Sequence, residues 1–527
     1  MAYISSYLKK AGKSVDCLDL NHSEEPVAQI LQSCFRKKRY SIICCGGLSI
    51  YYHQIKELVE LSRKYCPGAK IVLGGALVSC EPELMLDSLR PDYIVIGEGE
   101  QTILDLIDHL ENKQPVETVK GLAFRNSHGK CMLSLPRPRL TDLDALPIPD
   151  YEAFGYEQYL DNMHPSDIEF YDIFDHPRVH SIVGSRDCPF RCTFCYHVLG
   201  GKYTQRSIKS IMDELEYVVK KYRINVISFY DQLFAKDPER VLELCSKIKP
   251  FLNSLPWDCR WFVAGLRVPD ISDHLIKAMI DAGCFMISFG LESYSIDILK
   301  SYKKRTTPEQ IERAVRTTFN NRISLWANFV FFDIAETKHT AQITLDYWIK
   351  NSQIGLELTH LRPFPGTAIY KHCLAKGTIK DKLKFVADAS QQCFNTSDQL
   401  TEEEFNEVRH RIAEAWALHR KYAVPESLQR SSDGTICFTI ECPHCKSSIK
   451  YSNYLYIWPG MKIYCRRCRK TFFMISTRRK LISLSLLCII AKIVPGRLWQ
   501  YWNGLTREYL RKTFDYDDDK IEILSDE

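Results

Sequence analysis

Three closely spaced cysteines, Cys188, Cys192 and Cys195, are the residues of this chain best suited to chemistry, and they lie in the segment 184–196. Thiolates bind iron-sulfur clusters; four of them saturate a four-iron cluster, whereas three leave one iron free to take another ligand. The spacing therefore predicts a cluster with one open, reactive iron. The alternatives are a zinc site completed by His197 and cysteines that only fill a core.

Four further cysteines form two Cys-x2-Cys pairs that are separated by 19 residues: Cys442 with Cys445, and Cys465 with Cys468. This spacing is typical of a four-cysteine zinc ribbon, and a second iron-sulfur cluster is the alternative. A saturated metal has no open position, so we expect a structural or adhesive role. The basic residues around the second pair could contact phosphates, but a solvated basic face is the favoured interpretation, and nucleic-acid binding is not predicted (Arg466, Arg467, Arg469, Lys470).

The first 130 residues alternate between helical and extended apolar segments, which predicts a doubly wound α/β domain of the Rossmann or flavodoxin type. The strands are expected at 14–20, 40–45, 70–73 and 93–96, and the helices at 1–12, 52–65 and 101–110. Glycines follow three of these strands, at the sheet edge where such domains bind ligands (Gly46, Gly47, Gly74, Gly75, Gly97, Gly99). The sequence begins with a helix and offers no candidate for the usual first, central strand. Either the chain starts downstream of the true beginning, or the domain is degenerate.

Residues 131–175 are rich in proline and acidic residues and are expected to form an extended linker. A second βα alternation follows in residues 176–390, with strands near 181, 226–229, 261–264, 285–289, 327–332 and 357–361. Six such units predict a partial (β/α)6 barrel of the TIM type, whose site lies at the carboxyl ends of its strands. The remaining parts are a helical extension (391–430), the zinc ribbon (431–476), and a basic-apolar segment with an acidic tail (477–527).

Composition limits where the protein works. The 527 residues include 70 basic and 65 acidic side chains, so the net charge of +5 carries no global signature of nucleic-acid or membrane binding. The 21 cysteines do not follow the spacing of a secreted disulfide scaffold, and no secretory signal opens the chain, so a cytoplasmic location is predicted. The apolar run 481–494 is too short to span a bilayer. It could lie on a membrane surface, although a helix docked on the barrel explains it equally well.

The Cys-x3-Cys-x2-Cys loop, with Phe194 before its third cysteine, resembles the radical S-adenosylmethionine (SAM) superfamily. The resemblance continues through segments 229–234, 283–293, 304–310 and 361–367. It implies that the open iron binds SAM and that reduction splits SAM into a 5'-deoxyadenosyl radical, with Phe194, Asp231 and Glu292 near the SAM. The chain departs from the family pattern at Tyr294, where glycine is usual, and at Phe332–Thr337, which replaces a Gly-x-Pro-Gly-Glu-Thr turn.

The glycine-rich segments of the first domain, together with Leu143–Asp150, resemble the cobalamin-binding domain that precedes many radical SAM barrels. The resemblance implies that the following residues bind the cofactor: Gly74, Gly75, Gly97, Glu98 and Gly99. The Asp-x-His-x-x-Gly motif is absent, so no protein imidazole is expected below the cobalt. A flavodoxin-like scaffold that has lost its cofactor is the alternative.

By resemblance, the function that we expect is that of a cobalamin-dependent methyltransferase acting on an unactivated carbon, with an external electron donor such as flavodoxin or ferredoxin. A second hypothesis keeps the radical without methyl transfer, as in a cyclase, an oxidoreductase or a methylthiotransferase. A third is an inactive barrel that serves as a ribbon-mediated nucleic-acid or partner-binding protein.

Overall fold

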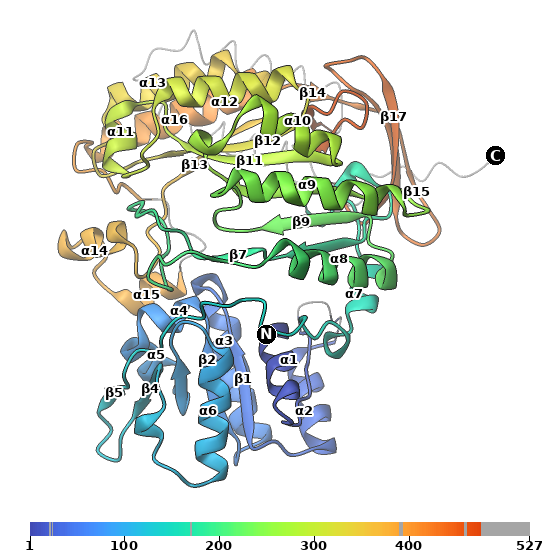
Figure 1. Cartoon of the computed structure of the whole chain (residues 1–527). Coiled ribbons are helices and arrows are strands. Elements are labelled where there is room, and N and C mark those ends of the chain that lie inside the picture. The colour runs from blue at the N-terminus through green and yellow to red at the C-terminus, as the bar shows by residue number, and fades with distance from the viewer. Residues whose placement is uncertain (21–22, 24, 169–170, 389–393, 458–460, 476–527) are drawn as a thin grey trace.

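The computed structural model describes residues 1–475 except 21–22, 24, 169–170, 389–393 and 458–460. An amino-terminal sheet domain, a barrel and a small β-rich module follow one another along the chain. In Figure 1 the first domain lies at the bottom, below the strands of the barrel, and the β-rich module lies at the upper right.

The amino-terminal domain contains a five-stranded sheet in the order β1-β2-β3-β4-β5. Its strands are β1 (Ile42–Gly46), β2 (Lys70–Gly74), β3 (Tyr93–Val95), β4 (Leu122–Arg125) and β5 (Cys131–Leu133). Its helices are α1 (Ala2–Lys10), α2 (Val27–Lys37), α3 (Tyr52–Tyr65), α4 (Ala76–Cys80), α5 (Pro82–Ser88) and α6 (Glu100–Glu111). The first three strands are parallel, so their glycine-bearing carboxyl ends meet at one edge, as predicted.

The predicted strand 14–20 is wrong, because this segment pairs with no strand among the described residues. A strand needs a neighbouring strand with which to form its backbone hydrogen bonds, and none of the described residues supplies one. Side chains hold the segment instead. Val15 packs against the same apolar cluster as Ile42 of β1, and the Asp16 carboxylate accepts a hydrogen bond from the Tyr40 hydroxyl at 2.8 Å.

The predicted linker 131–175 is only partly extended. β5 pairs antiparallel with β4, so the sheet domain continues to residue 133. A short helix, α7 (Tyr156–Asp161), then packs onto the barrel, where Leu160 and Met163 are buried in the core. Residues 134–151 contain no helix or strand, which leaves a shorter linker than the proline content suggested.

The barrel is a parallel sheet in the order β13-β12-β11-β10-β9-β6, which confirms the six predicted strands. The strands are β6 (Val179–Ile182), β9 (Val226–Tyr230), β10 (Arg260–Leu266), β11 (Cys284–Glu292), β12 (Ser324–Phe331) and β13 (Leu356–His360). The helices are α8 (Ile208–Tyr222), α9 (Pro238–Asn253), α10 (Asp273–Asp281), α11 (Ile296–Ser301), α12 (Pro308–Asn320) and α13 (Lys338–Lys350). Because β6 and β13 do not pair with each other, the barrel is open between these two edge strands.

Both departures from the family pattern are absorbed by aromatic packing. Tyr294 stacks on Tyr347 with ring centroids 3.7 Å apart. Phe332 follows β12 with φ +75°, a left-handed conformation that is strained for an aromatic residue. Its buried ring packs 4.5 Å from Phe405 of α16 (Glu402–His419). The bulky turn residue therefore docks a helix onto the end of β12.

Two short helices connect the barrel to the first domain: α14 (Ala368–Ala375) and α15 (Lys382–Ala387). Val386 of α15 is fully buried in the core of the amino-terminal domain, beside the α3 residue Ile55. The Lys382 ammonium lies 3.0 Å from the Glu81 carboxylate. Sequence segments that are 300 residues apart thus share one core.

The carboxyl-terminal module has two three-stranded sheets, β14-β19-β18 and β15-β16-β17. The strands are β14 (Tyr422–Ala423), β15 (Pro425–Arg430), β16 (Ile436–Glu441), β17 (Ser448–Tyr454), β18 (Lys462–Tyr464) and β19 (Thr471–Met474). The predicted helical extension to residue 430 is therefore wrong after α16. β15 and β16 form a hairpin whose turn uses Gly434 at φ +86°, a signal that the sequence carries in Asp433-Gly434.

No helix of the described part is both long enough and apolar enough to cross a bilayer. Two further segments lie outside the described residues: the apolar run 481–494, whose possible positions include a membrane surface, and the acidic tail.

Candidate active site

The three-cysteine loop leaves the carboxyl end of β6. Two short strands, β7 (Ser185–Arg186) and β8 (Thr204–Gln205), pair antiparallel and tie together the two ends of the loop. The loop therefore stands at the end of the barrel where a ligand is expected. Cys192 is buried, whereas Cys188 and Cys195 are half-buried.

Backbone contacts fix the shape of this loop. Asp187 adopts φ +67°, and one of its carboxylate oxygens accepts the Cys188 amide at 2.8 Å. Its other oxygen accepts the Gly201 amide at 2.5 Å, so one side chain joins both ends of the loop. The Thr193 amide donates to the Tyr302 carbonyl at 3.1 Å. These protein contacts hold the loop in shape without a cluster.

Two cations lie next to the thiols. Lys304 is buried, and its Nζ lies 2.7 Å from the Glu292 carboxylate. The Arg267 guanidinium lies 3.4 Å from the Phe190 ring centroid and donates to the Lys304 carbonyl at 2.9 Å. A hydrogen bond from Cys195, assisted by these cations, lowers the pKa of Cys192, whereas burial raises the pKa of Cys188 and the hydrogen bond to Cys192 raises the pKa of Cys195. The two cations would offset the negative charge of iron-bound thiolates, and in this respect the site fits an iron-sulfur cluster.

Asp231 follows β9 and is buried under the start of the loop. One carboxylate oxygen accepts the amides of Gly184 and Ser185, both at 2.7 Å. The other oxygen has no hydrogen-bond partner among the described residues. Burial raises the pKa of Asp231 to about 6. Half of the carboxylate thus positions the cluster loop, and the other half is buried without a hydrogen-bond partner.

Glu292 and Phe194 lie on either side of Lys304. Glu292 ends β11 at φ +65° and pairs with this lysine, so its carboxylate is not free in the structure. The Phe194 ring lies 5.9 Å below the Lys304 ammonium and 4.8 Å from the Tyr302 ring. The structure therefore brings Phe194 and Glu292 together with the cysteines, as the resemblance implied.

Different structural constraints act at the glycines of the first domain. Gly75 has φ +92°, and a Cβ there would lie 3.0 Å from the Gly47 carbonyl oxygen. Gly97 has φ +79°, and a Cβ at Gly99 would crowd Ile4 at 3.0 Å. A Cβ at Gly74 would meet nothing within 4 Å. Backbone geometry thus explains Gly75 and Gly97, side-chain packing explains Gly99, and of these four glycines only Gly74 has open space beside it.

Exposed apolar side chains follow the neighbouring strand, β1, whose last residue Gly46 pairs with Gly74. These are Leu48, Ile50 and Tyr51, and each is more than two-fifths exposed. Exposed apolar groups beside a glycine suit a large, flat ligand, since they could cover its faces while the backbone approaches its edge. The residues present therefore fit a cobalamin-type cofactor.

Glu98 points toward the barrel and contacts two arginines. Its two oxygens accept hydrogen bonds from Arg139 Nε at 2.9 Å and from Arg186 Nη1 at 3.0 Å. Arg186 also donates to Glu100 at 2.7 Å, and Arg139 donates to Asp187 at 3.0 Å. These five buried or nearly buried side chains, called the interdomain network below, join the first domain to the cluster loop.

Four cations near the cluster loop were not predicted from the sequence to contact it: Arg139, Arg186, Arg267 and Lys304. Arg186 precedes the first cysteine by only two residues, which was a usable signal. Lys304 lies in a segment already matched to the family, but nothing local marked it as buried. Arg139 and Arg267 are charged side chains in a linker and at a strand end, where solvent exposure is the ordinary expectation.

The four ribbon cysteines gather as predicted. Their sulfur atoms all lie within 4.8 Å of one another, with Cys442 3.8 Å from Cys468 and Cys445 3.7 Å from Cys465. Four sulfurs placed about 2.3 Å from a central zinc ion would be about 3.8 Å apart at the corners of a tetrahedron. The spacing matches tetrahedral metal coordination.

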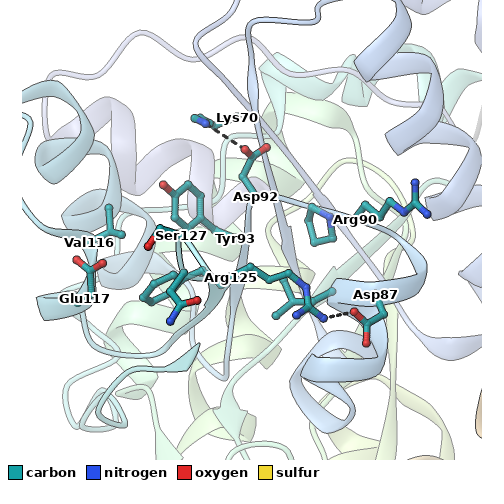
Figure 2. Close-up of a pocket in the computed structure, with 13 residues that line it drawn as sticks. Lys70, Asp87, Arg90, Asp92, Tyr93, Val116, Glu117, Arg125 and Ser127 are labelled. Carbon is teal, nitrogen blue, oxygen red and sulfur yellow. Dashed lines mark hydrogen bonds and ion pairs between the residues drawn. The ribbon is translucent and has the colours of Figure 1, made fainter. Parts of the chain in front are cut away.

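A hollow of about 600 Å³ lies at the opposite end of the amino-terminal sheet, where β2 and β3 begin. Figure 2 shows two ion pairs among its charged residues, Lys70 with Asp92 and Arg125 with Asp87. Ligands of such sheets bind beyond the carboxyl ends of the strands, so this hollow is not the candidate site.

Comparison with known proteins agrees with this arrangement. Residues 182–339 match the radical SAM superfamily model, and residues 1–107 match the B12 binding domain model. The chain belongs to the radical SAM superfamily, in the group whose barrel follows a cobalamin-binding domain.

Three similar proteins illustrate this group. An uncharacterized methyltransferase of Pyrococcus horikoshii is 26% identical over 384 residues, which is 72% of this chain and 79% of that protein. An anaerobic magnesium-protoporphyrin IX monomethyl ester cyclase of Rubrivivax gelatinosus is 26% identical over 65% of this chain and 60% of its own length. The solved radical SAM methyltransferase TsrM of Kitasatospora setae, with tryptophan substrate and a SAM analogue bound, has a TM-score of 0.60. It shares 18% identity over 72% of this chain and 73% of that one, and so shows a common fold.

Proposed function

We propose that this protein is a cobalamin-dependent radical SAM methyltransferase that acts on an unactivated carbon. The observation that carries the proposal is the interdomain network, in which Glu98 of the cobalamin-type domain contacts Arg186 beside the cluster cysteines. Methyl transfer of this kind would require both cofactor sites to be held close to one substrate, and the network connects the two loops that would hold them.

The chain's own residues have distinct tasks. Cys188, Cys192 and Cys195 would hold the cluster, and Asp187 keeps their loop closed. When bound, the cluster supplies the electron that cleaves SAM, and cobalamin carries the methyl group. By resemblance we assign Asp231 as the acceptor for the SAM amine, which is a hydrogen-bond donor; its unpartnered oxygen is buried and would have to become accessible to the ligand. Lys304 balances the negative charge of the thiolates and of Glu292.

An external one-electron donor is required by this class of enzyme, and we propose a flavodoxin or a ferredoxin. The substrate is a second partner. Relatives of this chain carry names that refer to different substrates, including tryptophan and a magnesium porphyrin ester, so the substrate must be identified by experiment.

The test is anaerobic reconstitution with iron, sulfide and cobalamin, followed by metal analysis and product assays with SAM and a reductant. We expect about four iron atoms per chain beyond any ribbon metal, and retained cobalt. We also expect 5'-deoxyadenosine and S-adenosylhomocysteine. The triple variant Cys188→Ala/Cys192→Ala/Cys195→Ala should lose the cluster iron and 5'-deoxyadenosine, while Cys131→Ala, a half-buried cysteine of β5, should keep both. Failure of the wild-type protein to retain cobalt would overturn the proposal.

Radical cyclisation is the second candidate, because the Rubrivivax gelatinosus relative is a cyclase of similar identity. The two functions differ in their products. A methyltransferase converts SAM into both S-adenosylhomocysteine and 5'-deoxyadenosine, whereas a cyclase yields 5'-deoxyadenosine without S-adenosylhomocysteine. A reconstituted, cobalt-containing enzyme that releases only 5'-deoxyadenosine would favour the cyclase.

A further inference from the structure

The four-cysteine ribbon lies at the end of the barrel remote from the cluster. Figure 1 shows its strands β15 and β17 on the side of the barrel opposite to helices α14 and α15. Phe285, the second residue of β11, packs edge-on against Tyr464 of β18, with ring centroids 6.0 Å apart. The ribbon therefore contacts the amino ends of the barrel strands, away from the catalytic face.

One side of the ribbon binds the chain that leads into the edge strand β6. The Tyr464 amide donates to the buried Asp172 carboxylate at 2.6 Å, and Arg466 donates to the Asp172 carbonyl at 2.7 Å. The Asp175 carboxylate accepts both Arg466 Nη2 at 2.8 Å and the Ser452 amide at 2.9 Å. The prediction that Arg466 belongs to a solvated basic face is thus wrong, since its charge is used within the molecule.

The other side of the ribbon binds the opposite edge strand. Lys462 Nζ lies 2.7 Å from the Glu357 carboxylate of β13, and Arg420 pairs with the same carboxylate. Both cationic side chains are almost fully buried, at 3% and 4% exposure. Separating the ribbon from β13 would leave the buried Lys462 ammonium without its partner, so this contact resists opening.

Both edges are contacted from one short segment, Lys462–Arg466. Its five residues bind β13 at one end and the approach to β6 at the other, and Cys465 lies between these two contacts. β6 and β13 are the two strands that the open barrel leaves unjoined. Cys465, one of the four clustered cysteines, therefore lies within the only segment of the described chain that forms ion pairs on both sides of the gap between β6 and β13.

We propose that Cys442, Cys445, Cys465 and Cys468 bind one zinc ion, and that this ion stabilises a clasp, formed by Lys462–Arg466, which joins the edge strands β6 and β13. The sulfur spacing supplies the site, and the two sets of contacts supply its role. The ribbon then maintains the shape of the barrel and is not an adhesive module for nucleic acid. This inference does not depend on methyl transfer, since its contacts are remote from the cluster loop.

The first experiment measures zinc in the variant that lacks the three cluster cysteines, so that cluster iron does not interfere. One zinc atom per chain is expected, and replacing Cys442 and Cys445 by serine should abolish it. Iron in place of zinc, or no bound metal, would overturn the assignment.

The second experiment measures hydrogen exchange in wild-type protein and in Lys462→Met, which retains all four cysteines. We expect the zinc content to be unchanged and the amides of segments 172–182 and 356–360 to exchange at least tenfold faster. Strand β2 should be unaffected. Lys450→Met, which removes an exposed lysine of β17, is the matched control.

The Cys442→Ser/Cys445→Ser protein should show the same two fast segments. If it does not fold, Lys462→Met still decides the question, because it keeps the metal. Wild-type exchange at both edges in Lys462→Met would show that the contacts do not act as a clasp.

Discussion

Replacing Glu98 by glutamine tests whether the interdomain network positions the cluster loop. The carboxylate accepts hydrogen bonds from Arg139 and Arg186, and only 7% of its side chain is exposed. Glutamine keeps the shape but has one acceptor oxygen, so its amide group must face one of the two guanidinium donors. The variant therefore removes one negative charge and places the glutamine amide group against a guanidinium N–H, so that two hydrogen-bond donors face each other, without creating a cavity.

The expected cost follows from the contacts that remain. A hydrogen bond to a charged group contributes about 1.5–3 kcal/mol. Arg186 keeps Glu100 at 2.7 Å and Arg139 keeps Asp187 at 3.0 Å, so neither arginine is left unpaired. We therefore expect a loss near the lower end of that range, about 2 kcal/mol, in the free energy of opening the loop. Since about 1.4 kcal/mol corresponds to a factor of ten, opening should become roughly 30-fold more frequent.

Hydrogen exchange in the reconstituted protein measures this opening directly, because the Gly201 amide donates to Asp187 at 2.5 Å within the loop. Peptides that cover residues 187–201 should exchange faster in Glu98→Gln, and peptides from the core strand β10 should not. Glu60→Gln, an exposed change on α3, is the control. Unchanged exchange in the loop, or an equal increase in the control, would refute the positioning role.

Three further predictions concern buried residues of the barrel. Phe332→Ala should lower the melting temperature more than Phe332→Gly. Both variants lose the contact with Phe405, but only glycine relieves the left-handed backbone strain of roughly 1–2 kcal/mol. A lower melting temperature for the glycine variant would refute the strain. Burial raises the pKa of Glu336 from 4.5 to about 7, so the native state holds an extra proton between these values and stability falls as the pH rises through this window. In thermal unfolding, Glu336→Gln should not show this fall in stability, which amounts to up to about 3 kcal/mol by pH 8 in the wild-type protein. Parallel curves of stability against pH for the two proteins would contradict the prediction. Lys304→Met leaves the Glu292 carboxylate buried without its cation, so we expect about 3–5 kcal/mol of destabilisation and less cluster iron per chain, and wild-type iron content would argue against its role.

The features that could be predicted from the sequence are those encoded locally. The six barrel strands, of four to nine residues, follow from extended apolar segments, and the two cysteine sites follow from spacing within one loop and within two Cys-x2-Cys turns. Helix α3 was predicted at its observed bounds because Tyr52, Ile55 and Val59 recur at helical spacing and are buried together. In each case the signal and the structure lie within the same short segment.

The features that could not be predicted from the sequence have the opposite character, because they depend on distant partners. Segment 14–20 has the composition of a strand, but no described strand pairs with it. The SAM contact of Asp231 stays a prediction, and its hydrogen bonds to backbone amides 46 and 47 residues earlier had no local signal. A residue type indicates what a side chain can do, whereas its partners determine which of those capacities is still free.

Charged residues show this most clearly. Glu98 was predicted from a glycine-rich motif to contact a cofactor, which stays a prediction, and Arg466 was predicted from a basic run to face solvent; the structure gives each an internal ion pair. Their partners lie 88 and 291 residues away, beyond the reach of any local pattern. Both pairs join separate parts of the fold, one at the cluster loop and one at the base of the barrel. Since ionised side chains are rarely removed from solvent unless they are paired, these two pairs mark contacts between parts of the fold that no local pattern could reveal.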